Sequence, residues 1–190
     1  MDIPKVEVLG HKEFARLFVE NAFEHEFDLA TSEELRLDHG IMIPILYSNP
    51  NLNIPVVPIL ININSEPMPN VKRCVKLAKV LKDTIENKLP EHERVAVIAT
   101  GGLSHWLPPG TGKINEEWDH MIMDTISSGM GEKLYDLSND EILKCGGNGG
   151  QEIKTWIMMS AMVPEKKGNV IFYEPIPSWA TGMGGLIMNL

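Results

Sequence analysis

The sequence contains few cysteines and no long hydrophobic run. Its only two cysteines, Cys74 and Cys145, lie far apart and show none of the spacings typical of a cysteine metal site. We expect reduced thiols, although one disulfide would also fit the count. No apolar run approaches the roughly 20 residues that a membrane-spanning helix needs, and the first residues lack the order of a signal peptide. The sequence therefore predicts a cytoplasmic protein without a membrane partner.

Clustered positive charge is also missing. The chain has 17 Lys and Arg against 26 Asp and Glu, a net charge of -9. The basic residues are scattered, and Lys72-Arg73 and Lys166-Lys167 are no more than doublets. Because phosphate contacts need clustered Lys and Arg, we expect no nucleic-acid partner. The length of 190 residues and the 43% apolar content are sufficient for one domain with a real core.

Hydrophobic spacing predicts alternating helices and strands. Apolar residues recur at helical spacing in several segments and form short buried-strand runs in others. We expect helices at 13–24, 69–87, 118–126, 139–144 and 151–162, and strands at 54–63, 94–100 and 170–173. Thr31 to Glu34 resembles a helix cap, and Ser138 is a second candidate cap. The alternation indicates an α/β fold with a mixed or largely parallel sheet flanked by helices.

The segment Ala99 to Pro109 is the most informative stretch. An apolar strand-like run enters Gly101 and Gly102, and the loop then presents Ser104 and His105. Glycines allow close approach to the backbone, and histidine can transfer protons near neutral pH. A capping or packing role for His105 is the alternative. A hydrolase pair is disfavoured, because adjacent residues in an extended loop point apart and a Gly-x-Ser-x-Gly elbow is missing.

Two further residues are candidates for a functional site. Glu152 follows the glycine-rich stretch Gly146 to Gly150 at the start of a predicted helix. It could simply be a favourable first-turn carboxylate, but the glycines indicate that the backbone approaches something closely. His39 lies in the turn Asp38-His39-Gly40, where Asp38 could simply hold it at the surface. His11, His25, His92 and His120 are expected to be solvated.

Together, the segments 38–40, 99–109 and 146–156 resemble the class III extradiol ring-cleavage dioxygenases, and above all the large iron-binding subunit of those that cleave protocatechuate or gallate. The resemblance runs from about Phe14 to the C-terminus. It implies Fe(II)- and O2-dependent cleavage of a catecholic aromatic acid such as protocatechuate or gallate. A small accompanying subunit or a homo-oligomer is the partner that it implies.

The resemblance also implies a role for each matched residue. His105 corresponds to the acid/base residue beside the iron, and Glu152 to an iron ligand. His39 corresponds to a second pocket histidine that is not a ligand. Ser178 and Thr181 correspond to a C-terminal segment that lines the substrate pocket.

The resemblance is incomplete in its metal ligands. The family has two further histidine ligands in a segment that precedes the matched part. We therefore expect residues 1–190 to form one incomplete catalytic domain, equivalent to the C-terminal two thirds of the family domain. A fragment, a protein completed by another chain and a non-catalytic relative that binds an aromatic acid or a partner subunit are the three explanations, and we favour the first.

Overall fold

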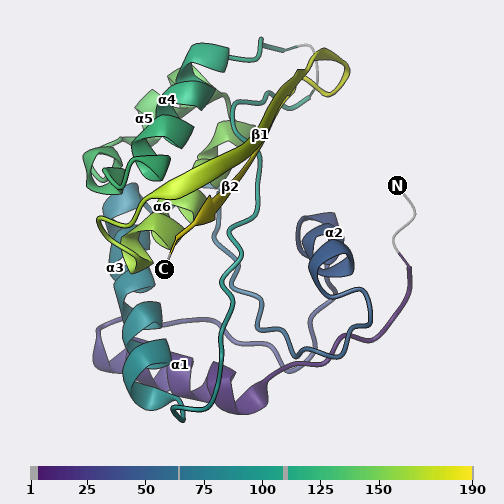
Figure 1. Cartoon of the computed structure of the whole chain (residues 1–190), viewed down its shortest axis with the longest axis vertical. Helices are drawn as coiled ribbons and strands as arrows, with labels where there is room; N and C mark the ends of the chain where they lie inside the picture. Colours follow the sequence, from purple (N-terminus) through teal and green to yellow (C-terminus); the bar gives the residue numbers. More distant parts are fainter. Residues whose placement is uncertain (1–3, 64, 109–110, 190) are drawn as a thin grey trace. The chain divides into compact units, whose positions relative to one another are not determined.

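The computed structural model describes residues 4–63, 65–108 and 111–189. The chain divides into two compact units. The first consists of Met1–Leu60 and Val80–Thr100, and the second of Ile61–Lys79 and Gly101–Leu190. Figure 1 shows the elements of both along the chain. Each unit is described by itself.

The first unit is built around α1 (Lys12–Glu24), which confirms the helix predicted at 13–24. Its apolar face buries Phe14, Phe18 and Ala22. The helix packs against η1 (Thr84–Lys88), a π-helical turn that continues α3 (Val71–Asp83), so the predicted helix at 69–87 is confirmed as two joined elements.

The second helix of this unit begins later than the sequence suggested. The predicted cap at Thr31 to Glu34 is wrong, because that segment is irregular and exposed. The helix α2 runs over His39–Ser48, and its cap is Asp38, whose Oδ1 accepts a hydrogen bond from Ile41 N at 3.3 Å. The apolar run that a cap needs behind it begins only after Asp38.

The two strongest predicted strands are not strands. Segments 54–63 and 94–100 are irregular apart from an isolated bridge between Val56 and Gly10. Val95, Val97 and Ile98 are exposed. The apolar, β-branched composition favours a strand, but a strand also needs a hydrogen-bonding neighbour, and the described residues provide no further strand beside these segments.

The sheet lies in the second unit and is an antiparallel hairpin of β1 (Gly168–Ile176) and β2 (Thr181–Met188). The α/β class is thus confirmed, whereas the mixed or largely parallel sheet is corrected among the described residues. Two consecutive strands joined by only a few residues must pair antiparallel. Here the short helix η4 (Pro177–Trp179) and Ala180 join the strands. The predicted strand at 170–173 is confirmed within β1.

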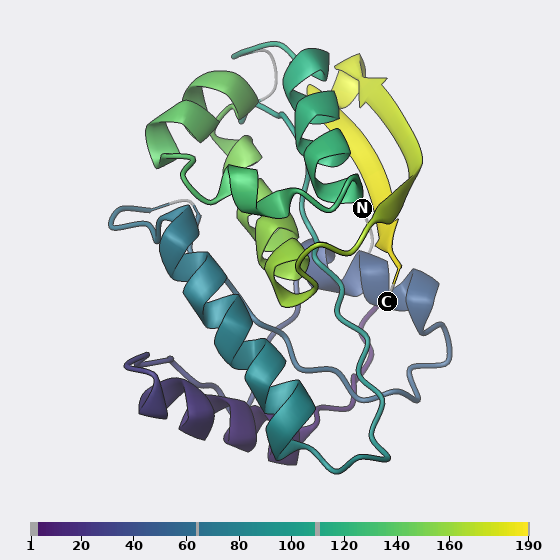
Figure 2. The same cartoon turned by 60° about the vertical axis from the view of Figure 1, so that its left-hand side comes forward.

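Helices cover this hairpin. Those predicted at 118–126, 139–144 and 151–162 are confirmed, and the last begins with a 3-10 turn. The elements are α4 (Glu116–Ser127), η2 (Gly131–Leu134), α5 (Asn139–Gly146), η3 (Gly149–Glu152) and α6 (Ile153–Met162). Ser138 caps α5 in a capping box with Glu141, as its position predicted. The helix α4 lies along the hairpin (Figure 2).

The core of this second unit is dense around α4 and α6. A Cβ on Gly184 of β2 would lie 2.8 Å from Leu103 Cδ1 and 2.9 Å from Met123 Sδ, so a larger residue there would displace these two side chains. Lys154 of α6 is fully buried, and its Nζ has no hydrogen-bond partner among the described residues. Burial lowers the pKa of this ammonium group. Over the described part of the chain, every helix is too short or too polar to cross a membrane.

Candidate active site

His105 is held in a short extended segment beside the start of β2. His105 pairs with Thr181 in an antiparallel bridge, and Gly182 N donates to Ser104 O at 2.8 Å. On the other side, His105 N donates to Gly146 O at 2.8 Å. His105 is therefore 7% exposed, and its backbone is fixed between the hairpin and the end of α5.

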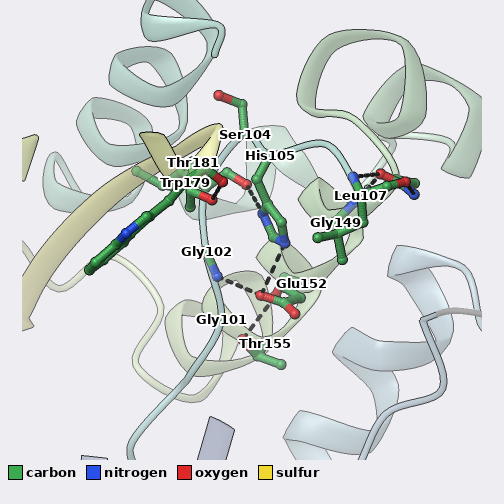
Figure 3. Close-up of polar contacts among 12 residues, drawn as sticks. Gly101, Gly102, Ser104, His105, Leu107, Gly149, Glu152, Thr155, Trp179 and Thr181 are labelled. Atoms are coloured by element: carbon green, nitrogen blue, oxygen red, sulfur yellow. Dashed lines mark hydrogen bonds and ion pairs between the residues drawn. The ribbon is translucent and has the colours of Figure 1, made fainter. Parts of the chain in front are cut away.

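The imidazole of His105 has a defined orientation. Nδ1 lies 3.1 Å from Leu103 O. Because a carbonyl oxygen can only accept, this hydrogen bond requires the hydrogen on Nδ1. In the neutral ring Nε2 then carries the lone pair, and it lies 3.9 Å from Glu152 Oε2 (Figure 3). This distance agrees with the resemblance, which implies that His105 and Glu152 lie beside the same metal.

Glu152 ends η3 immediately before α6, and the loop at Gly101 and Gly102 orients its carboxylate. Gly102 N donates to Glu152 Oε2 at 2.6 Å. Gly101 has a φ of 125°, and a Cβ there would lie 2.5 Å from Glu152 Cβ. A side chain at Gly101 would therefore be strained by its backbone and would also displace the carboxylate.

The glycine-rich loop approaches His105 itself. A Cβ on Gly149 would lie 2.0 Å from both Cδ2 and Nε2 of the imidazole, and one on Gly147 would lie 2.2 Å from His105 O. Asn148, between them, binds the backbone of Leu107 twice: its Oδ1 accepts from Leu107 N at 2.8 Å and its Nδ2 donates to Leu107 O at 2.6 Å. The glycines of this loop predicted a close approach to the backbone, and the group that approaches it is His105.

Ser104 points away from His105 (Figure 3). Its Oγ donates to Asp119 Oδ2 at 2.8 Å and accepts from Asn115 N at 2.9 Å. The hydroxyl is therefore occupied in a buried structural contact, and it faces away from any base that His105 could supply. This geometry removes the hydrolase alternative. Asp119 was not predicted, because on the sequence it resembles one more charge on an amphipathic helix.

The other predicted site residues are less central. Thr181 lies beside the loop, with its Cγ2 3.3 Å from the position of a Cβ on Gly102. Ser178 is exposed in η4, at the turn of the same hairpin. His39 is exposed at the first position of α2. The helix α2 belongs to the first unit, whereas His105 belongs to the second.

The residues around His105 do not fit Fe(II) by themselves. A non-haem iron oxygenase site typically combines two histidines and one carboxylate on one face of the metal. Glu152 provides a suitable oxygen, but the described parts of the chain contain no cluster of three His, Cys, Asp or Glu side chains that could hold a metal. Glu152 and His105 are thus a pair rather than a complete ligand set.

Comparisons with known proteins place this geometry in context. The chain is 32% identical over 196 residues to gallate dioxygenase of Pseudomonas putida, covering 99% of this chain and 55% of that protein. It is 26% identical over 230 residues to 2,3-dihydroxyphenylpropionate/2,3-dihydroxicinnamic acid 1,2-dioxygenase of Photorhabdus laumondii, covering 96% and 72%. The chain therefore spans only about half the length of the first relative. With residues 1–184 matched, the chain belongs to the family described as the catalytic LigB subunit of aromatic ring-opening dioxygenase.

Proposed function

We propose that this chain carries the acid/base side of a dioxygenase site that opens the ring of a small catecholic aromatic acid with O2. The observation that carries the proposal is the buried His105, whose Nε2 faces Glu152 Oε2 at 3.9 Å while Nδ1 is held by Leu103 O. The relatives support the substrate class, because their names specify gallate and 2,3-dihydroxyphenylpropionate. Both compounds are acids with an aromatic ring that carries two or three hydroxyl groups.

In this proposal His105 moves a proton. Its Nε2 takes the proton from a substrate hydroxyl, which makes the ring electron-rich for attack by O2, and later returns it. A positioned general base of this kind contributes about 10²–10⁴-fold to a rate. Both atoms of O2 enter the product as the ring bond beside the hydroxyls breaks, so the product is a ring-opened semialdehyde or dicarboxylate.

Glu152 is the metal ligand that this chain offers. Fe(II) is the cofactor that the family resemblance implies, and a hard carboxylate oxygen suits it. The site as described needs further ligands before it could hold the metal selectively. His39, Ser178 and Thr181 are proposed contacts of substrate or O2. A cytoplasmic location, and a small second subunit or another copy of the chain as partner, complete the proposal.

A second candidate function is a non-catalytic member of the family that binds an aromatic acid or a partner subunit. The incomplete ligand set around Glu152 favours it. Iron content distinguishes the two functions. One Fe per chain together with oxygen uptake on protocatechuate or gallate supports the enzyme, whereas gallate binding without iron or oxygen uptake supports the binding protein. A chain that consumes no oxygen and binds neither gallate nor a partner subunit refutes both.

The roles of the two residues are separated by their variants. This chain alone should bind Fe(II) weakly or not at all. In a protein with the missing ligand segment restored, Glu152→Ala should lose iron after anaerobic addition of Fe(II), because a methyl group cannot replace an anionic oxygen donor. His105→Gln should keep the iron content of the parent chain and lose oxygen uptake by about 10²–10⁴-fold. His92→Gln, at an exposed histidine, is the matched control and should change neither. Equal loss of iron in the His105 and Glu152 variants would show that His105 is itself a ligand.

A further inference from the structure

A fully buried carboxylate, that of Asp119, lies against Ser104 in the segment that carries His105. Asp119 of α4 is 0% exposed and accepts three hydrogen bonds. They come from Ser104 N at 2.7 Å, from Ser104 Oγ at 2.8 Å and from the hydroxyl of Tyr173 in β1 at 2.8 Å. Gly182 also packs closely against this carboxylate, because a Cβ at Gly182 would lie 2.0 Å from Asp119 Oδ2.

Such a carboxylate is costly unless it is fully hydrogen-bonded. Burial raises the pKa of the Asp119 carboxyl, and the hydrogen bonds from Ser104 and Tyr173 oppose that rise. A buried acid that only filled space would be replaced at less cost by an apolar residue. Two of its three bonds go to one residue, Ser104, so the contact specifically immobilises that residue.

Fixing Ser104 also fixes the direction of its neighbour. In an extended segment successive side chains point to opposite sides, and Figure 3 shows Ser104 and His105 pointing apart. With Ser104 held on α4 by both its backbone N–H and its hydroxyl, the next side chain must face the loop at Gly102 and the carboxylate of Glu152.

We infer that Asp119 is a positioning residue for His105. Through Ser104 it fixes the segment from Leu103 to His105, so that Nδ1 reaches Leu103 O and Nε2 faces Glu152. The catalytic importance of this position rests on the proposed function, but the position itself does not.

The magnitude follows from the contacts that are lost. Asp119→Ala removes both acceptors of Ser104, and the freed segment no longer aligns Leu103 O with the imidazole. Losing one typical hydrogen bond to Nδ1 lowers the ratio of the Nδ1–H to the Nε2–H tautomer by about five- to tenfold. In a protein that turns over, a displacement of the general base by about 1 Å costs on the order of 10²-fold in rate.

The test is imidazole nitrogen NMR of the metal-free full chain at one fixed pH at which histidine is neutral. His105→Gln identifies the His105 signals. We expect the Nδ1–H tautomer to dominate in the parent chain, the ratio to fall about five- to tenfold in Asp119→Ala, and a smaller fall in Asp119→Asn, which keeps one oxygen for Ser104 N. Asp124→Ala, at an exposed position of the same helix, should leave the ratio unchanged.

Tyr173→Phe separates positioning from general packing, because it removes one bond to Asp119 and leaves both bonds to Ser104. Its tautomer ratio should stay within about twofold of the parent, less than the effect of one hydrogen bond. An unchanged ratio in folded Asp119→Ala overturns the inference, and so does an equal fall in Tyr173→Phe. If Asp119→Ala does not fold, an unchanged ratio in Asp119→Asn overturns it. Absence of ring cleavage in a protein whose iron ligands are complete would refute the proposed function and leave this result standing.

Discussion

Gly149→Ala is expected to damage the site by steric contact alone. The added methyl would lie 2.0 Å from Cδ2 and from Nε2 of His105, which is far inside van der Waals contact. The imidazole cannot simply rotate away, because its Nδ1 is bound to Leu103 O and its backbone N–H to Gly146 O. Either the ring moves and loses Nδ1–H···O, or the loop at Gly149 moves.

The neighbouring residue provides the scale. A Cβ on Gly150 would have Leu103 O at 3.8 Å and Ile142 O at 3.9 Å as its nearest neighbours, which are ordinary contacts. Gly150→Ala should therefore be neutral or gain about 0.4–1 kcal/mol from the less flexible unfolded chain. Gly149→Ala makes the same gain but adds an overpacking cost of about 1–3 kcal/mol. The two variants should thus differ by about 1–3 kcal/mol in the free energy of unfolding.

Chemical denaturation measures this difference, and the imidazole NMR signals of His105 show whether the ring has moved. Both glycines are buried in the same 3-10 turn, so their helical propensities and solvent exposure are matched. We expect shifted His105 signals in Gly149→Ala alone. Equal stability and equal His105 spectra in the two variants would refute the placement of the imidazole against Gly149.

Two further substitutions test contacts that do not involve the proposed metal ligand. Lys154→Met should raise the free energy of unfolding at neutral pH by about 1–3 kcal/mol, since it removes a buried ammonium group that has no hydrogen-bond partner in the described part of the chain. The pKa of Lys154 in the folded chain lies below its ordinary value of 10.5, so the parent chain gains stability as the pH rises from the folded pKa to the ordinary one. The stability advantage of Lys154→Met should therefore shrink at alkaline pH. A lower stability of Lys154→Met than of the parent chain in denaturation at pH 7 would contradict this prediction. Asn148→Ala should cost about 1 kcal/mol and speed hydrogen exchange of the Leu107 amide, whereas unchanged exchange would show that the Asn148 contact does not form in solution.

The helices were predictable because their signals are local. The face of Phe14 and Phe18 in α1, and the capping box of Ser138 in α5, depend on residues a few positions apart. Strands depend on a partner that may lie anywhere in the chain. The apolar segment 94–100 therefore looked like a strand without being one, whereas β2 was missed because Gly182, Gly184 and Gly185 give it little strand propensity.

The site was predictable to a similar depth. His105 and Glu152 were expected together from their motifs, and the 3.9 Å distance confirms their proximity. The close contacts that hold the two side chains come from Gly102, which donates to Glu152, and from Gly149, which lies against the His105 ring. Asp119 could not be found from sequence, because its role depends on a distant loop folding back onto a helix that would look ordinary by itself.

The hydrogen bond between Nδ1 of His105 and Leu103 O has a consequence for the order of proton transfers. The protonated ring carries hydrogens on both nitrogens, so Nδ1 can keep its bond to Leu103 O whether the ring is neutral or charged. The proton that arrives at Nε2 therefore leaves from Nε2, and no ring flip separates the two events. In the proposed reaction a single nitrogen thus works in both directions, and the rotation of a buried imidazole never limits the turnover.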